Sequence, residues 1–377
     1  MSSLQDSLDR PFSLYLDLTR LLAAVAVVLA HFRYNAIIPD DAWSFLPYLG
    51  REAVIVFFVL SGYVIAASTA QRRPSARDYA VARLSRVYSV VLPVLFLALA
   101  CAAALRAWTG SVGNAGYVLD KLYVYLPFHL LFLGQHWQLT EVPPLMIPYW
   151  SLGYEAWYYL LFGLACYLRG TRRKVAIALV LAIMGYKMWL LLPVWLSGAW
   201  LYRHYRAPLL APRAARLGWL ATLLVFGLYV GTDAETALRA AGTAWWPFDS
   251  LPLGSADRFL ADYVVCAIVL ANFACARDAQ FSALVRHAQA WRLAASHTFT
   301  LYLSHSLVIA LWLALYPHDP RSSVDILGLG VAIVVVTVAL GAVTERRPHL
   351  YRALFGRLLG AGRSPPLASA AVREPRG

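Results

Sequence analysis

The sequence predicts an all-α integral membrane protein: a bundle of about ten transmembrane helices with both termini in the cytoplasm. Of its 377 residues, 60% are hydrophobic and only 14% are charged. Ordinary soluble domains contain about 45–50% hydrophobic and about 25% charged residues. A soluble chain of this size cannot bury so much apolar surface, so composition excludes a soluble enzyme, a disordered tail, a collagen-like fibre and a disulfide-rich secreted module.

The predicted spans follow from apolar blocks of about 17–25 residues, the length that crosses a bilayer as a helix. Two of the blocks are short and follow each other closely, so we expect a pair of tight spans separated at Pro193. The predicted spans are 13–32, 50–69, 87–105, 149–168, 174–190, 193–203, 214–231, 259–275, 297–316 and 324–343.

One further apolar block, 122–134, carries Pro127 and His129 and is too short for a confident span. We expect 122–148 to enter the membrane and return on the outer side, although a full crossing stays open. With ten crossings, Lys and Arg in the cytoplasmic stretches outnumber those outside by three to one, whereas an eleventh crossing would invert every later loop. This positive-inside bias favours ten.

The net charge of +13 is therefore mainly an orientation signal, and we expect no nucleic-acid partner. The predicted domains are a cytoplasmic N-terminus (1–12), a transmembrane domain (13–345) and a basic, disordered cytoplasmic tail (346–377). The four Cys lie in apolar runs without metal-ligand spacing, so we interpret them as small core residues and expect no metal site.

Charged side chains inside spans are costly and therefore mark functional sites. Arg20 and His31 are 11 residues apart, and three helical turns take about 10.8 residues, so both lie on one helix face. We expect that face to line a cavity, with Arg20 in the inner half and His31 near the outer end. The alternative is that Arg20 snorkels to the inner surface and His31 is interfacial.

Glu155 lies in a span that begins near Trp150 and descends from the outer side. Ser151, Glu155 and Tyr158 fall on one helix face, which Tyr159 shares. Because Glu155 is at a depth comparable with His31, we expect its carboxylate to lie beside the imidazole and raise its basicity. The alternative is a structural carboxylate paired with an arginine.

Three other residues are candidates. His305 is near the middle of a later span, where a structural hydrogen bond is the simpler interpretation and catalysis the alternative. Arg83 and Arg86 are three apart at the cytoplasmic mouth of a span. They either anchor the topology or capture phosphate, which suits the forked guanidinium group.

In order along the chain, these residues resemble the membrane-bound acyltransferase family 3, of the stand-alone kind without an extra hydrolase-like domain. Arg20 and His31 match its Arg, ten residues, then His, although Leu18-Thr19-Arg20 departs from the usual Leu-Arg-Gly. The other matching elements are Phe57-Phe58-Val59-Leu60-Ser61-Gly62-Tyr63, Arg83-Leu84-Ser85-Arg86, Trp150-Ser151-Leu152 with Glu155, Tyr302-Leu303 with His305, and Glu345-Arg346-Arg347-Pro348.

The resemblance implies transfer of an acyl group, commonly acetyl from acetyl-CoA, to a hydroxyl, typically of an exopolysaccharide or lipopolysaccharide sugar, at the bacterial inner membrane. Acyl-CoA is then a donor substrate, with no tightly bound cofactor, and the bilayer and a glycan or lipid-linked sugar are partners. A macrolide or lipid acceptor stays open, as does a small-molecule transporter, although no internal repeat is visible. The oligomeric state, the acyl group and the acceptor are not indicated.

The resemblance also suggests roles for the candidate residues. His31 would take the proton of the attacking hydroxyl, Glu155 would orient or charge it, and the acyl-CoA arm would enter along Arg20. A covalent acyl-His31 relay is the alternative. Arg83 and Arg86 would bind acyl-CoA, and the residues expected to contact substrate are Trp150, Ser151, Tyr158 and His305.

Overall fold

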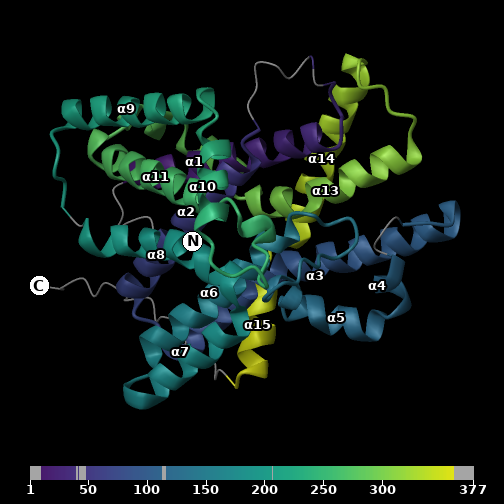
Figure 1. Cartoon of the computed structure of the whole chain (residues 1–377), viewed down its shortest axis with the longest axis horizontal. Coiled ribbons are helices and arrows are strands. Elements are labelled where there is room, and N and C mark those ends of the chain that lie inside the picture. The colour runs from purple at the N-terminus through teal and green to yellow at the C-terminus, as the bar shows by residue number, and fades with distance from the viewer. Residues whose placement is uncertain (1–9, 40, 42–47, 113–115, 206, 361–377) are drawn as a thin grey trace, which may run out of the picture.

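The computed structural model describes residues 10–39, 41, 48–112, 116–205 and 207–360, and every regular element in these ranges is a helix (Figure 1). The all-α prediction is confirmed. By length and composition, seven helices in the described part of the chain can cross a membrane. These are α1 (Arg10–Tyr34), α2 (Gly50–Arg72), α3 (Ala76–Thr109), α9 (Pro212–Gly231), α11 (Phe259–Ala279), α13 (Thr298–Leu315) and α14 (Ser323–Val343).

Three further predicted spans correspond to α6 (Tyr149–Tyr167), α7 (Gly170–Met184) and α8 (Tyr186–His204). They are shorter or more polar than those seven helices, so ten crossings and the cytoplasmic position of both ends stay predictions. The remaining helices are short: α4 (Gly116–Asp120), α5 (Leu122–Leu130), η3 (Leu133–Gln135), α10 (Ala234–Trp245), η4 (Gly254–Ala256), η5 (Ser282–His287), α12 (Ala288–Ala295) and α15 (Pro348–Leu358).

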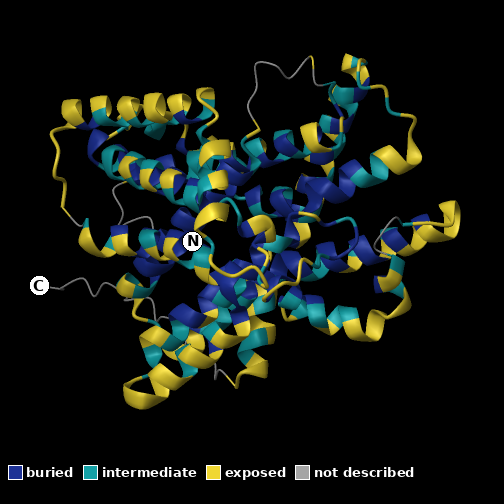
Figure 2. Cartoon of the chain, viewed as in Figure 1, coloured by how far each residue is buried: buried dark blue, intermediate teal, exposed yellow. Residues whose placement is uncertain are grey.

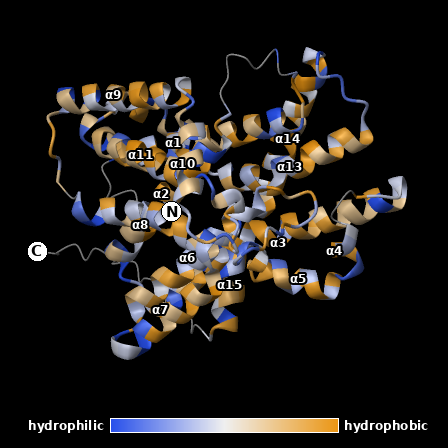
Figure 3. Ribbon diagram, in the orientation of Figure 1, coloured by the Kyte–Doolittle hydropathy of each residue, from blue (hydrophilic) through white to orange (hydrophobic). Residues whose placement is uncertain are grey.

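The outer helices expose apolar side chains, the reverse of a soluble protein. In α9 only Ala215 and Tyr229 are buried, and in α14 a valine-rich face is exposed. Figure 2 shows exposed residues along α9, where Figure 3 shows hydrophobic ones. A continuous apolar exterior of this kind suits lipid and not water, because exposed apolar patches on soluble proteins are small.

The centre of the bundle depends on a close crossing of α2 and α8, which contact each other along much of their lengths. A Cβ atom at Gly62 would lie 1.9 Å from the carbonyl oxygen of Trp195, and one at Gly198 would lie 1.9 Å from that of Val59. Only glycine fits at both positions. This contact explains the glycine in the Leu-Ser-Gly motif of α2, since it brings the backbones of the two helices together.

The predicted separation of two tight spans at Pro193 is wrong. The chain breaks at Gly185, between α7 and α8, and Pro193 lies inside α8. Gly185 has a φ of 81°, and a Cβ there would lie 2.7 Å from the backbone nitrogen of Trp137. A left-handed turn packed against a neighbouring backbone requires glycine, whereas the helix accommodates the proline.

The segment after α3 does not form a membrane-length helix. Helix α5 has nine residues and is roughly 14 Å long, about half the thickness of a bilayer core. Phe132, with a φ of 58°, then turns the chain into η3, and the segment continues to the start of α6. This geometry agrees with a segment that enters and returns.

The tail predicted to be disordered from residue 346 contains a helix, α15, over Pro348–Leu358. Tyr351 and Phe355 are half-buried, and the ring of Phe355 lies 5.5 Å from that of Tyr88 on α3. Aromatic residues at helical spacing thus hold this basic segment against α3. The rest of the predicted tail, 361–377, lies outside the described residues.

Candidate active site

A narrow cavity lies where α1, α2, α3, α6 and α13 meet, and we call it the central cavity. Its volume is about 90 Å³. Apolar side chains form most of its wall, but four charged groups, each from a predicted site position, also line it: Arg20, Arg83, Arg86 and Glu155. Its other polar lining residues are Ser61, Ser151, Tyr159, Thr298 and Tyr302.

The positive side of the central cavity comes from α1 and α3. Arg20 is mostly buried, and its Nη1 lies 3.4 Å from Oδ1 of Asp17, one turn earlier on α1. The guanidinium carbon of Arg83 lies 5.8 Å from the ring centre of Tyr79 and 5.9 Å from that of Tyr159. The Nε atom of Arg83 is buried and has no hydrogen-bond partner among the described residues. These guanidinium groups form an anion-binding environment inside an apolar wall.

Glu155 faces these arginines, and hydroxyl groups hold its carboxylate. Oε1 accepts a hydrogen bond of 2.5 Å from Ser61 Oγ and another from the hydroxyl of Tyr159, one turn further along α6. Ser61 Oγ in turn accepts a bond of 3.2 Å from the indole nitrogen of Trp195 on α8. Because Gly62 brings α8 against α2, the glycine contact also positions this network.

The expected pairing of Glu155 with His31 is therefore not what the structure shows. Glu155 bonds to Ser61 and Tyr159, while the ring of His31 packs against His305 of α13 at a centroid distance of 4.8 Å. Equal depth in the membrane was the basis for the expected pair, but the two residues face different neighbours. Their separation depends on the angular placement of α6 around the bundle, which a single sequence does not reveal.

Both imidazoles have the same tautomer. His31 Nδ1 lies 2.9 Å from the carbonyl oxygen of Val27, and His305 Nδ1 lies 2.9 Å from that of Leu301. A carbonyl oxygen only accepts, so each Nδ1 carries the hydrogen and each Nε2 presents a lone pair. His305 is fully buried, and its Nε2 has no hydrogen-bond partner within the described ranges. The pair therefore offers proton acceptors within the bundle.

Tyr302 connects the central cavity to this histidine pair. Its hydroxyl is hydrogen-bonded to Ser151 Oγ at 2.5 Å, and both residues line the cavity. Its ring centre lies 6.3 Å from that of His305, which follows it by one helical turn towards the C-terminal end of α13. Arg20 lines the central cavity, as expected, whereas His31 does not line it and packs against His305 of α13, so the two residues do not share one cavity.

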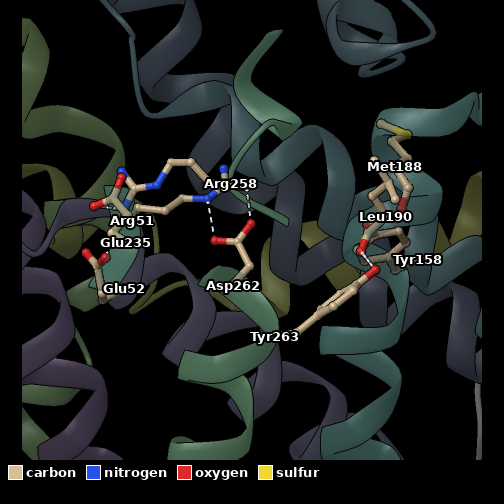
Figure 4. A network of polar contacts seen from close by, with 9 residues as sticks. All are labelled: Arg51, Glu52, Tyr158, Met188, Leu190, Glu235, Arg258, Asp262 and Tyr263. Atoms are coloured by element: carbon tan, nitrogen blue, oxygen red, sulfur yellow. Dashed lines mark hydrogen bonds and ion pairs between the residues drawn. The ribbon is translucent and has the colours of Figure 1, made fainter. Parts of the chain in front are cut away.

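Trp150 and Tyr158, two of the residues expected to contact substrate, do not line the central cavity. The hydroxyl of Tyr158 donates a hydrogen bond of 2.7 Å to the carbonyl oxygen of Met188 on α8, and its side chain is fully buried (Figure 4). Trp150 packs against Arg51, whose guanidinium carbon lies 5.0 Å from the centre of the indole ring. Their aromatic rings stabilise the contacts of α6 with its neighbours; that they, and His305, contact substrate stays a prediction.

A buried ion-pair network at the N-terminal ends of α2 and α11 was missed from the sequence (Figure 4). Arg51 donates two hydrogen bonds to the carboxylate of Asp262, of 3.0 and 2.6 Å, and the two side chains are only 8% and 2% exposed. Beside them Arg258 contacts Glu52 at 2.8 Å and Glu235 at 2.7 Å. Charged residues at the edges of apolar blocks were the available signal, but they were counted only as topology signals.

At the opposite end of the bundle, Glu345 follows α14 and caps the first turn of α13. One of its carboxylate oxygens accepts hydrogen bonds from the backbone nitrogen of Thr300, at 3.3 Å, and from its hydroxyl, at 2.9 Å. Burial raises the pKa of Glu345, and the positive charge of Arg86 partly offsets this. The carboxylate of the closing motif thus lies in the electrostatic field of the cavity's arginines.

The fold and site define a class: a helical membrane protein with a basic, partly apolar internal cavity and a neighbouring pair of imidazole bases. A family model described as an acyltransferase domain matches residues 13–346. The chain belongs to membrane acyltransferase family 3 and is a membrane acyltransferase. Comparisons with curated proteins and with solved structures gave no match. In the described ranges, no group of three His, Cys, Asp or Glu is arranged to hold a metal ion.

Proposed function

We propose that this membrane acyltransferase moves an acetyl group from cytoplasmic acetyl-CoA to a sugar hydroxyl. The acceptor is a glycan or lipid-linked glycan, of exopolysaccharide or lipopolysaccharide type, on the outer side of a bacterial inner membrane. The observation that carries the proposal is the fixed tautomer of His31: its Nδ1 is bound to the carbonyl oxygen of Val27, which leaves Nε2 as a proton acceptor beside His305, whose ring lies 6.3 Å from that of the cavity-lining Tyr302. An acyl transfer to a hydroxyl requires such a base.

In the proposed reaction the acceptor hydroxyl donates its proton to His31 Nε2 while its oxygen attacks the thioester carbon. The carbon–sulfur bond breaks, the new ester forms, and the imidazolium returns the proton to the departing CoA thiolate. His305 Nε2 accepts a hydrogen bond from the acceptor and orients it. Guanidinium groups in a dry cavity stabilise the developing oxyanion, and Arg20 is the residue assigned to this task.

Glu155 takes a different part from the one expected from its depth. Its carboxylate balances the arginines of the central cavity and orders the hydroxyl groups of Ser61 and Tyr159 along the donor's path. Arg83 and Arg86 bind the donor from the α3 side. Ser151 and Tyr302 are hydrogen-bonded on the wall of the central cavity, and Tyr302 also lies next to His305; in the proposed reaction this pair parts when the thioester meets the hydroxyl.

The test uses membranes containing the full chain, incubated with isotope-labelled acetyl-CoA and surface glycan from a host strain that lacks the protein. We expect labelled acetyl ester on the glycan, released by mild base and detected by mass spectrometry. His31→Ala should remove the label with the protein still present in the membrane. Normal acetylation by this variant would remove His31 as the base, and a wild type that never transfers acetyl would refute the proposed reaction.

A further inference from the structure

A second cavity lies at the corner where α2 turns into α3, and we call it the corner cavity. Its volume is about 380 Å³, roughly four times that of the central cavity. Two helix ends and α15 surround it. Its polar lining residues are Ser68, Thr69, Arg72, Asp78, Tyr79, Arg83 and Arg352.

The corner cavity is basic. Among the described residues, three guanidinium groups line it against one carboxylate, that of Asp78. This carboxylate is already engaged at the start of α3, where it accepts a hydrogen bond of 2.7 Å from Ser75 Oγ. Ser75 Oγ also accepts from the Asp78 backbone nitrogen at 3.1 Å, so the aspartate belongs to the helix cap. Forked guanidinium groups with neighbouring hydroxyls suit phosphate oxygens.

Arg83 lines both the corner cavity and the central cavity, so the two cavities share this side chain as part of their walls. Along α2, the distance from Ser61 in the central cavity to Arg72 in the corner cavity is about 16 Å. The central cavity, at about 90 Å³, has room for a thin chain but not for a nucleotide, whereas the corner cavity is larger at about 380 Å³, and both are lined by arginines. This arrangement fits a ligand with a polyanionic head and a long, thin, uncharged arm.

Helix α15 provides the third arginine of the corner cavity. Packing of Phe355 on Tyr88 fixes α15 against α3, and Arg352, three residues earlier, reaches the cavity. Arg352 lies beyond residue 346, where the match to the acyltransferase family ends. This ligand-facing group is therefore a feature of the chain outside the shared domain.

We propose that the corner cavity binds the phosphate groups at the nucleotide end of the acyl-CoA donor, with Arg72 and Arg352 as direct ligands. The inference rests on the proposed function, because it takes CoA as the donor. The donor's pantetheine arm then passes Arg83 and brings the thioester into the central cavity. An anionic lipid headgroup offers the same phosphate chemistry and is the competing source that the experiment has to separate.

The experiment measures binding of CoA and of pantetheine, which lacks the phosphates, to the full chain in nanodiscs of neutral lipid. Arg352→Gln should weaken CoA binding about tenfold, as expected for a lost charge-assisted bond to phosphate, and leave pantetheine binding unchanged. Arg72→Gln should behave in the same way. Arg357→Gln is the matched control, since Arg357 is exposed on the same helix and does not line either cavity.

Four outcomes would overturn the inference. Equal CoA affinity of Arg352→Gln and the wild type removes the corner cavity as the phosphate site and leaves the proposed reaction intact. If the substitution weakens the binding of CoA and of pantetheine equally, it acts on the path of the pantetheine arm and not on a phosphate contact. If nanodiscs containing anionic lipid abolish CoA binding in the wild type but not in Arg352→Gln, the cavity is a headgroup site. A wild type that does not bind CoA refutes the donor assignment itself.

Discussion

The imidazole rings of His31 and His305 pack edge to face, with centroids 4.8 Å apart and planes at 74°. Each ring is held through Nδ1 by the carbonyl oxygen four residues earlier on its own helix. Two neutral imidazoles in this arrangement present their Nε2 atoms without competing for the same backbone partner. The contact joins the first helix of the chain to α13, nearly 300 residues later.

We expect His31→Ala to lower the rate of acetyl transfer by about 10²–10⁴-fold, the usual contribution of a general base. His305→Gln should have a smaller effect and act mainly on KM for the acceptor, because an amide still accepts a hydrogen bond. The transfer rate and the KM for the acceptor are both obtained from initial rates measured with purified protein in detergent. His349→Ala, on the exposed side of α15, is the control. A similar loss of kcat in both variants, with KM unchanged, would show that the pair acts as one unit.

Glu155→Gln should abolish transfer while the protein folds, because the amide keeps the shape but removes the only carboxylate that the described residues place on the wall of the central cavity. Tyr159→Phe should retain part of the activity, since Ser61 still donates to the carboxylate. Activity and thermal unfolding are measured on the same preparation. If Glu155→Gln unfolds well below the wild-type temperature, the carboxylate is structural.

Breaking the Arg51–Asp262 pair should cost stability. Arg51→Ala leaves an uncompensated buried carboxylate, and we expect a loss of about 3–5 kcal/mol in unfolding free energy. The control is Arg239→Ala, which breaks an exposed pair with Asp257 and should cost about 0–1 kcal/mol. Reversible denaturation in mixed micelles gives both values. A loss below about 1 kcal/mol for Arg51→Ala would contradict this account.

Gly62→Ala should prevent normal folding, because its new Cβ atom would overlap the carbonyl oxygen of Trp195. Gly198→Ala should do the same from the α8 side. Gly227→Ala in α9 is a matched control, since a Cβ atom there would meet no described neighbour within 4 Å, and it should be neutral or up to about 1 kcal/mol stabilising. The yield of monodisperse protein in size-exclusion chromatography measures whether each variant folds. Normal yields of Gly62→Ala would show that the two helices separate easily.

The raised pKa of Glu345 makes its contribution to stability depend on pH. The folded state binds the proton more tightly than the unfolded state, so this contribution is complete below the unfolded pKa. It is lost as pH rises through the folded pKa. We expect thermal stability to fall across this window, which begins at about pH 4, and Glu345→Gln to lack the decline. Identical pH profiles for the two proteins would contradict the assignment.

Much of the fold could be predicted from the sequence, because the length of apolar blocks and the distribution of Lys and Arg are strong indicators of membrane-spanning helices. Pro193 was misleading, since a proline in a span is tolerated, whereas the break at Gly185 depends on a contact with the distant Trp137. Helix α15 was not predicted, because its basic composition indicated disorder and the aromatic residues that pack on α3 were overlooked.

Part of the candidate site could be predicted from the sequence. Arg20, Arg83, Arg86 and Glu155 meet in one cavity, as buried charges in separate spans tend to do. The partners of each charge were not predictable, because they depend on how the helices are rotated against one another. Thus Glu155 faces Ser61 instead of His31, and Tyr158 faces Met188 instead of the cavity.

The glycine contact between α2 and α8 has a mechanical consequence. At Gly62 and Gly198 the backbones of the two helices are in direct contact, and no side chain lies between them at these two points. The same contact holds Ser61 of α2 and Trp195 of α8 together, where the indole nitrogen donates a hydrogen bond of 3.2 Å to the hydroxyl oxygen. A substitution that widens this contact would therefore also shift Ser61, and with it the hydrogen bond that Glu155 accepts on the wall of the central cavity.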